Sequence, residues 1–176
     1  MAILAHINNQ ITQSWDGLKR NFSKGEDLAL SAYLDPLLIL FLEAESRDDA
    51  LEQMVASLQK AGRLQNVSAF HKAVLNREKI VSTGVGLGVA IPHAKLEGHE
   101  NFFIVIGIQR GQGLEWSALD GAPVRLIFLI GGPGNKQTEY LKILSRLTVA
   151  VKNEERRKKL LKASSVQEIF ELFSSN

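Results

Sequence analysis

Two nearly continuous apolar runs near the middle of the chain, Phe102 to Ile108 and Val124 to Ile130, constrain its fold most. Both runs are rich in Ile, Val and Phe, and such runs are typical of strands that are covered on both faces. Helices on both sides of a central group of strands predict an α/β layer fold. Segments with helical spacing of apolar residues do lie before and after the two runs, at 46–62, 67–77, 136–151, 154–162 and 166–173.

Residues suited to helix ends stand at the boundaries of these segments. Ser46 begins a pattern that resembles a capping box, and Gly62 is placed to end the same helix. Asn153 is a candidate N-cap for the helix that follows it, whose acidic residues precede its basic ones as the helix dipole prefers. Ser165 and Glu168 have the spacing of a capping box for the last helix.

The first 30 residues differ from the rest of the 176-residue chain. Their apolar residues fall on one helical stripe, and the polar stretch 23–27 then breaks the pattern. We therefore divide the chain into an N-terminal amphipathic arm and linker at 1–30 and one main domain at 31–176. Such a stripe packs on the core or a neighbour, or it binds a partner; its members are Ile11, Trp15, Leu18 and Phe22.

Composition and charge exclude several classes of function. The chain has no cysteine, which excludes disulfide scaffolds, thiolate zinc sites and cysteine nucleophiles. Its net charge of +2 is too small to indicate a nucleic-acid partner. The basic residues concentrated at 156–162 fit a solvated helix end, or a docking patch for an acidic partner.

No segment is predicted to cross a membrane. The most apolar run, Leu37 to Leu42, follows Pro36 and is a candidate buried strand. It is far shorter than the roughly 20 residues that a spanning helix needs. The N-terminus lacks the basic region and cleavage pattern of a signal peptide, so we expect a cytoplasmic protein.

A glycine-rich stretch, Ser82-Thr83-Gly84-Val85-Gly86-Leu87-Gly88, precedes a short apolar run at 89–91. Alternating glycines allow peptide N–H groups to converge on an anion, although they also mark tight turns. The spacing is not that of a dinucleotide-binding fingerprint, because a strand-like segment follows instead of a helix. It is not a Walker A loop either, because no Gly-Lys-Ser/Thr follows.

His93 ends that apolar run, directly after Pro92. A neutral imidazole is a good nucleophile and can be phosphorylated, whereas a lone histidine is more often structural. His6, His71 and His99 lie in less suggestive surroundings. No metal site or cofactor is expected, because no two histidines have the spacing of a metal-binding motif.

The residues Arg77-Glu78-Lys79, Ser82-Thr83-Gly84-x-Gly86-x-Gly88 and Val89-Ala90-Ile91-Pro92-His93 together strongly resemble a known active-site block. It is that of the type 2 enzyme IIA (EIIA) domains of the phosphotransferase system (PTS), the fructose/mannitol type, including the nitrogen-regulatory branch. The resemblance runs from about Tyr33 to Phe173 and includes Leu119-Asp120-Gly121-x-Pro123-Val124.

This resemblance implies a single-domain layered fold with a mixed β-sheet flanked by α-helices. It implies that His93 accepts a phosphoryl group from a small phosphocarrier protein, HPr or its nitrogen-branch relative NPr. The group then passes to a sugar-specific EIIB domain, or the phosphorylation state regulates a target protein. Arg77 would stabilise the phosphoryl group with a planar cationic fork. Residues expected near the phosphate are Ser82, Thr83, Gly84, Gly86 and Gly88, with turn capping as the alternative for the first two.

One position departs from the family pattern. Tyr140 stands where the family usually has a second histidine near the start of a helix. A phenol can donate a hydrogen bond to a phosphoryl oxygen, but it cannot become a cation. Two interpretations therefore remain: a working phosphocarrier, or a regulatory docking module in which phosphorylation is impaired. Tyr140 could also be simply a packed aromatic.

Overall fold

The two apolar runs form the centre of the β-sheet. The computed structural model describes residues 29–174. Its strands β5 (Phe103–Gln109) and β6 (Leu126–Gly132) pair antiparallel, and every residue in both is buried. This confirms the prediction of two doubly covered strands, although both begin slightly later than expected. Val124 lies outside β6 and makes an isolated bridge to Leu114.

The remaining strands extend this pair on both sides. β1 (Ile39–Leu42) runs parallel to β5, and β3 (Val89–Ala90) and β4 (His93–Lys95) both run parallel to β6. The edge strand β2 (Gly84–Gly86) is antiparallel to β3. The described chain therefore contains a six-stranded mixed sheet with the order β1-β5-β6-β3-β2, with β4 also on β6.

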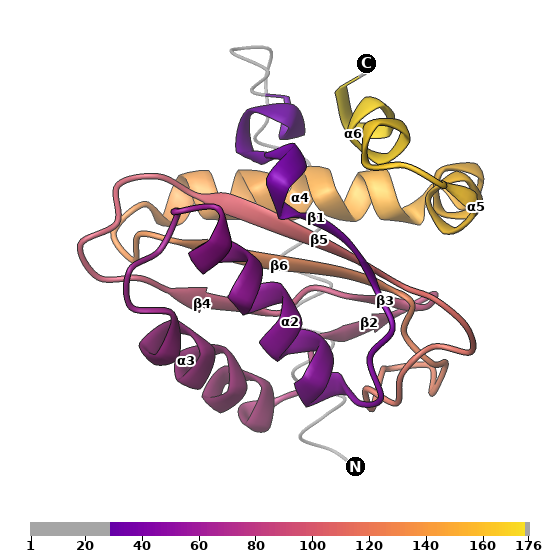
Figure 1. Cartoon of the computed structure of the whole chain (residues 1–176), viewed down its shortest axis with the longest axis horizontal. Coiled ribbons are helices and arrows are strands. Elements are labelled where there is room, and N and C mark those ends of the chain that lie inside the picture. The colour runs from indigo at the N-terminus through magenta and orange to yellow at the C-terminus, as the bar shows by residue number, and fades with distance from the viewer. Residues whose placement is uncertain (1–28, 175–176) are drawn as a thin grey trace.

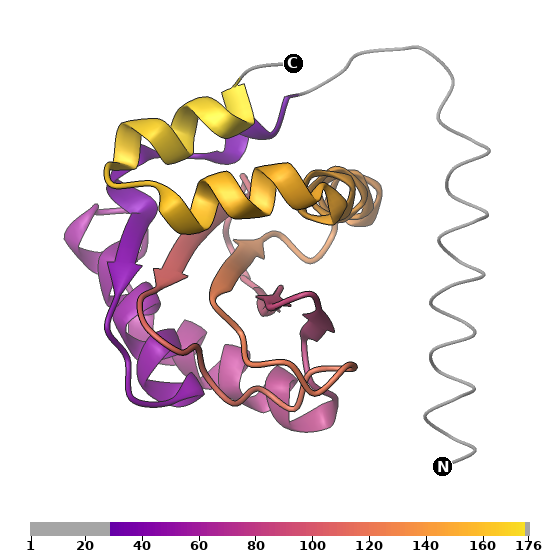
Figure 2. The same ribbon diagram turned by 90° about the vertical axis from the view of Figure 1, so that its right-hand side faces the viewer.

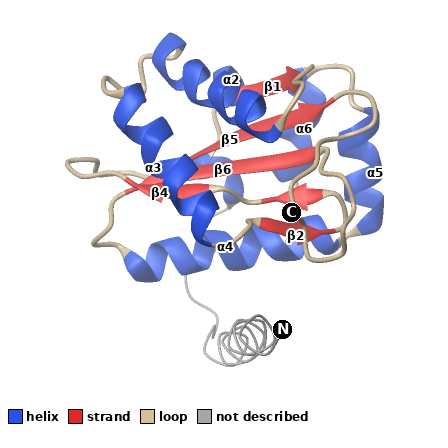
Figure 3. Ribbon diagram, turned by 90° about the horizontal axis from the view of Figure 1, so that it is seen from below, coloured by secondary structure: helices blue, strands red, loops and turns tan. Residues whose placement is uncertain are grey.

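Helices cover both faces of the sheet (Figure 1). α2 (Arg47–Lys60) and α3 (Val67–Ile80) lie on one face, in front of the strands in Figure 3. α4 (Gln137–Lys152), α5 (Glu154–Lys162) and α6 (Val166–Ser174) lie on the other (Figure 2). Alternate residues of β5 and β6 enter two separate hydrophobic clusters, one under each group of helices. The α/β layer fold expected from the sequence is confirmed.

The predicted helix ends are present. Ser46 accepts a hydrogen bond from the backbone N–H of Asp49, and Asn153 accepts one from that of Arg156. Gly62 has a φ of +64° directly after α2, in the left-handed region that glycine adopts without strain. These contacts satisfy backbone groups that a helix leaves unpaired at its ends.

Two segments differ from the sequence expectation. The run from Leu37 to Leu42 is not one buried strand, because Pro36–Leu38 forms a 3-10 helix (η2) and the Leu37 side chain is 68% exposed. Pro36 suits the first helical position, and Asp35 caps the turn by accepting the backbone N–H of Leu37. The helix expected over 67–77 continues to Ile80, which brings Arg77 into its last turn.

The N-terminal arm, with its apolar stripe and His6, lies outside the described residues apart from its last two positions. Leu30 begins a 3-10 helix (η1, Leu30–Tyr33) and packs in the core beneath α4 and α6. Tyr33 donates a hydrogen bond to the Glu139 carboxylate on α4, 3.1 Å away. The core therefore includes Leu30. Within residues 29–174, no helix is both long and apolar enough to cross a bilayer.

We expect a protein that begins at residue 29 to keep a single cooperative thermal transition. The reason is that residues from Leu30 to Phe173 already form a hydrophobic cluster on each face of the sheet. A truncation that also removes residues 29–34 takes away Leu30 and Tyr33, and should lower the melting temperature by about 5 °C or more. Circular dichroism melts of the two proteins and the full chain measure this. Loss of folding in the first truncation would instead place the apolar stripe in the core.

Candidate functional site

Pro92 sets the position of His93. It has no backbone N–H, so the ladder between the β3–β4 segment and β6 is interrupted between Ala90 and His93. The carbonyl of Pro92 still accepts the N–H of Ile130, at 2.9 Å. Pairing then resumes at His93, whose Cα partner on β6 is also Ile130. The histidine therefore begins a new strand at the end of the sheet nearest α3.

Hydrogen bonds to both ring nitrogens fix the tautomer of His93. Its Nδ1 lies 3.1 Å from the carbonyl oxygen of Ile91, which can only accept, so Nδ1 carries the proton. Its Nε2 lies 3.2 Å from Arg77 Nε–H, which can only donate. Nε2 therefore holds the free electron pair and is the nucleophilic nitrogen of the ring.

The surroundings of His93 favour its neutral form. Burial lowers the pKa of the imidazole below its usual 6.5, and the nearby Arg77 charge lowers it further. The Ile91 carbonyl and the Glu78 carboxylate oppose this effect without cancelling it. Near pH 7 the ring is a neutral nucleophile, and this is the protonation state that attack on an electrophile needs.

Arg77 reaches His93 from the last turn of α3. Besides the bond to Nε2, its Nη1 donates to the carbonyl of Val81, 3.0 Å away. That carbonyl lies just beyond the helix, so the guanidinium is held between the helix end and the imidazole. The other guanidinium N–H groups remain available to an anion.

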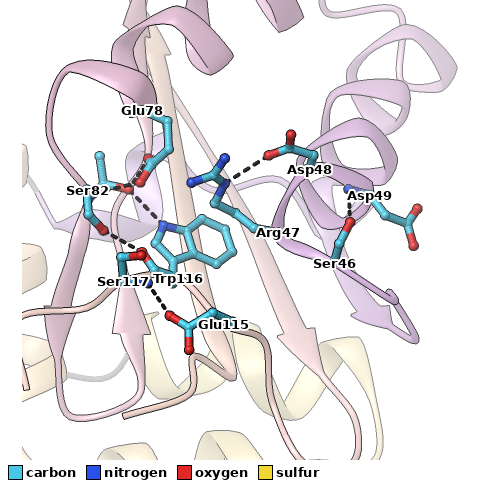
Figure 4. A network of polar contacts seen from close by, with 10 residues as sticks. Ser46, Arg47, Asp48, Asp49, Glu78, Ser82, Glu115, Trp116 and Ser117 are labelled. Atoms are coloured by element: carbon cyan, nitrogen blue, oxygen red, sulfur yellow. Dashed lines mark hydrogen bonds and ion pairs between the residues drawn. The ribbon is translucent and has the colours of Figure 1, made fainter. Parts of the chain in front are cut away.

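A buried network anchors the chain beside Arg77 (Figure 4). The Glu78 carboxylate is buried and accepts both the backbone N–H and the hydroxyl of Thr83, at 2.8 and 2.6 Å. The Thr83 hydroxyl also accepts the indole N–H of Trp116, which is 1% exposed. The Ser82 hydroxyl donates to the Trp116 carbonyl at 2.6 Å. The network joins α3, the start of β2 and the loop after β5.

Tyr140, on the first turn of α4, packs beside His93, and both line a cavity of about 500 Å³. The two ring centroids are 5.6 Å apart, and the Phe102 ring stacks on Tyr140 at 6.1 Å. Burial raises the pKa of Tyr140 to about 12, so its phenol is neutral near pH 7. Arg77, His93 and Tyr140 all line this cavity.

The glycine-rich stretch does not line the cavity. It forms the β2–β3 hairpin, in which Gly86 and Leu87 have φ angles of +90° and +60°. The backbone N–H of Leu87 donates to the Asp120 carboxylate, 2.8 Å away. The hydroxyls of Ser82 and Thr83 are engaged in the Trp116 network. The residues that line the cavity therefore include none of those that the sequence analysis expected near the phosphate, which are Ser82, Thr83, Gly84, Gly86 and Gly88.

Among the side chains that line the cavity, sequence reasoning missed the polar or aromatic ones Lys95, Phe102 and Gln137. Lys95 lies two residues after His93 in β4, and Gln137 lies three residues before Tyr140 in α4, so each shares a face with a residue already singled out. No sequence feature indicated a role for Phe102 in the site, because it is one apolar residue within an apolar run.

The other described histidines lie elsewhere. His99 packs edge-on against the Phe103 ring, and His71 lies on α3 with its Nε2 buried and unpaired in the part of the chain that the structure describes. No group of three His, Cys, Asp or Glu residues that could hold a metal occurs within 29–174.

Comparisons with known proteins identify the family and the fold. Residues 32–176 match the family described as "Phosphoenolpyruvate-dependent sugar phosphotransferase system, EIIA 2". The fructose-specific EIIABC component of Bacillus subtilis is 37% identical over 137 residues, which are 78% of this chain and 21% of that protein. The nitrogen regulatory protein of Bradyrhizobium diazoefficiens is 33% identical over 135 residues, 76% of this chain and 86% of that protein.

A solved structure gives the same result. The crystal structure of the nitrogen regulatory protein IIA-Ntr from Neisseria meningitidis superposes with a TM-score of 0.75 at 30% identity. The similarity covers 82% of this chain and 98% of that one. The chain thus spans about a fifth of the length of the fructose-specific relative and nearly all of the Neisseria protein.

We expect His93 to titrate below pH 6.5 in the folded protein. Between the folded and unfolded pKa values the folded state binds fewer protons, so stability rises with pH there. The contribution of neutral His93 is present above the unfolded pKa and is lost as the pH falls through the folded pKa. An NMR titration of the imidazole signals measures the value directly.

In the same titration, Arg77→Ala should raise the pKa of His93, because it removes both a cation and the N–H that stabilises the neutral ring. Lys72→Ala, at an exposed position on the same helix, is the matched control and should leave the value in place. A His93 pKa that stays or falls in Arg77→Ala would contradict this account of the site.

Thr83→Val should lower the free energy of unfolding by about 1–3 kcal/mol, because Glu78 Oε2 loses the hydroxyl that donates to it and the Trp116 indole N–H loses its acceptor, while the backbone N–H of residue 83 stays on Glu78 Oε1. Thr138→Val makes the same chemical change at an exposed position and should cost less than about 0.5 kcal/mol. Urea unfolding curves measure both. Equal effects at the two positions would mean that the network does not stabilise the fold.

Proposed function

This chain belongs to the EIIA type 2 family of the phosphoenolpyruvate-dependent sugar phosphotransferase system, and we propose that it is a phosphocarrier that accepts a phosphoryl group on His93. The observation that carries this proposal is the state of the His93 ring. Its unprotonated Nε2 lies beside an arginine and its Nδ1 proton is held by the Ile91 carbonyl, and the residue lines a cavity together with that arginine.

In the proposed reaction, the electron pair on Nε2 attacks phosphorus. A new N–P bond forms, and the bond to the donor breaks with its electron pair going to the donor. Positive charge develops on the His93 ring because Nδ1 keeps its proton. The Ile91 carbonyl that accepts this proton, 3.1 Å away, supports that charge.

Arg77 supplies the matching stabilisation of the phosphoryl oxygens. Its Nε–H donates to the same Nε2 that must attack, so phosphorylation exchanges this hydrogen bond for one to a phosphoryl oxygen. The bond from Nη1 to the Val81 carbonyl keeps the guanidinium nearby during the exchange. Arginine suits this task because its planar fork offers several donors and a permanent charge.

We propose that the donor is a small phosphocarrier of the HPr or NPr type, and that the transfer takes place in the cytoplasm. The phosphoryl group then goes to an EIIB domain, or the two phosphorylation states bind a regulated protein differently. The relatives include both a fructose-specific and a nitrogen regulatory protein. Neither similarity is large enough to choose between these two outcomes.

Tyr140 keeps a second candidate function open, that of a docking module in which phosphorylation is impaired. Its neutral phenol supplies no charge to a phosphoryl group. Its hydroxyl nevertheless makes no hydrogen bond within residues 29–174, and the residue lines the same cavity as His93, so the hydroxyl can donate one hydrogen bond to a phosphoryl group there. We therefore favour the working phosphocarrier.

Incubation with a phosphocarrier, enzyme I and phosphoenolpyruvate should add one acid-labile, base-stable phosphate per chain. His93→Ala should abolish this label while circular dichroism remains that of the folded protein. Tyr140→Phe should slow transfer by about fivefold, since one hydrogen bond is worth about 1 kcal/mol.

Tyr140→His restores the residue typical of the family and is the matched comparison, with transfer at least as fast as in the wild type. Label that persists in His93→Ala would place the acceptor elsewhere. A wild-type chain that takes no label while Tyr140→His does would support the docking module instead.

A further inference from the structure

The charged side chains that line the cavity are both basic. They are Arg77 and Lys95, and no aspartate or glutamate among residues 29–174 lines it. The imidazole of His93 therefore shares the cavity with two basic side chains. A phosphoryl group carries up to two negative charges at neutral pH, so this charge pattern suits it.

Lys95 is placed on the same side of the sheet as His93. Both belong to β4, whose register on β6 pairs His93 with Ile130 and Lys95 with Gly132. Because side chains alternate along a strand, residues two apart share a face. Pro133, at the start of the loop that leads into α4, also lines the cavity, and Gly134 of that loop lies close to the Lys95 side chain, so Lys95 lies beside the segment that carries Tyr140.

The stem of Lys95 is supported, whereas its ammonium group is free. A Cβ added at Gly134 would lie 3.2 Å from Lys95 Cδ, so the absence of a side chain there leaves room for the lysine stem. Within residues 29–174 the ammonium makes no hydrogen bond or ion pair, while Lys136 on the same loop is bonded to the Glu100 carbonyl. The only other cation of the cavity, Arg77, already donates to Val81 and His93.

We propose that Lys95 is the second phosphoryl-binding cation of this site and pairs with the phosphoryl group carried by His93. The proposal rests on the phosphocarrier function and identifies a residue that sequence reasoning did not. Tyr140 cannot fill this place, because its phenol stays neutral. Arg77 then holds the phosphoryl group from the α3 side, and Lys95 holds it from the α4 side.

The first test follows the phosphorus atom itself. In the phosphorylated wild type and in Lys95→Gln, the phosphohistidine signal is titrated by ³¹P NMR. Loss of a nearby cation should raise the second pKa of the phosphoryl group by about half a unit. Lys142→Gln, which removes an exposed charge from α4 outside the cavity, is the control and should leave the titration unchanged.

The second test does not need phosphorylation. Inorganic phosphate is titrated into unphosphorylated protein, and the His93 imidazole signals report binding. Lys95→Gln should bind phosphate about fivefold more weakly than wild type and Lys142→Gln, as expected for one lost charge-assisted contact. Lys95→Arg should recover most of the affinity.

The outcomes separate this inference from the proposed function. Equal ³¹P titrations and equal phosphate affinities in wild type and Lys95→Gln would overturn the role of Lys95 even if His93 is phosphorylated. If the titrations and affinities are equal but Lys95→Gln accepts the phosphoryl group from the carrier protein more slowly, Lys95 acts in docking of that partner. This outcome also overturns the inference. A wild type that takes no label but binds phosphate fivefold better than Lys95→Gln would refute the phosphocarrier function and leave the cation site standing.

Discussion

A buried carboxylate, that of Glu78, holds together the parts of the molecule that form the site. It carries no ion pair among the described residues, and two donors from Thr83 satisfy it instead. A buried charge without such partners is costly, so the last turn of α3 and the start of β2 are held in one arrangement. Arg77 directly precedes Glu78 on that turn, so its backbone position is fixed by the same bonds. The Trp116 indole extends the anchor into the loop after β5.

The other half of the site is formed by the sheet, where glycines leave space that larger residues would fill. A Cβ on Gly132 would collide with the Phe102 ring, and one on Gly131 would collide with the Phe103 ring. Two glycines at the end of β6 therefore let two aromatic rings lie close to the strand. Phe102 then stacks on Tyr140 and sets the wall that faces His93.

The sequence predicted those parts of the fold that depend on local chemistry. Continuous apolar runs predicted β5 and β6, and residues such as Ser46, Gly62 and Asn153 predicted helix ends, because side-chain caps and a left-handed glycine act within a few residues. In the run after Pro36, Ile39–Leu42 forms the predicted strand, but the first two residues were predicted wrongly, because a proline and an aspartate together favour a turn that overrides their apolar pattern.

The site was less predictable, because it depends on contacts between distant segments. Nothing near Ser82 or Thr83 in the chain indicates that their hydroxyls are occupied by Trp116, more than 30 residues later. Lys95 could have been found from its spacing to His93 alone, since strand periodicity is local. Phe102 could not, because its role follows from Gly132 on another strand and Tyr140 on another helix.

The arrangement around His93 balances two opposed requirements of a phosphoryl carrier. To accept the group, the ring must be neutral, and burial together with the Arg77 charge favours that state. To release it, the ring must be a good leaving group, which requires positive charge on the imidazole. The Ile91 carbonyl and the Glu78 carboxylate both act in that direction, because each raises the pKa of the same ring. In the proposed phosphohistidine, Arg77 and Lys95 would stabilise the phosphoryl oxygens, while the Ile91 carbonyl at Nδ1 and the Glu78 carboxylate would stabilise the positive charge on the ring. A carrier needs both kinds of stabilisation. If only the phosphoryl oxygens were stabilised, the group would not be released, and if only the ring cation were stabilised, the imidazole would be protonated and could not attack phosphorus.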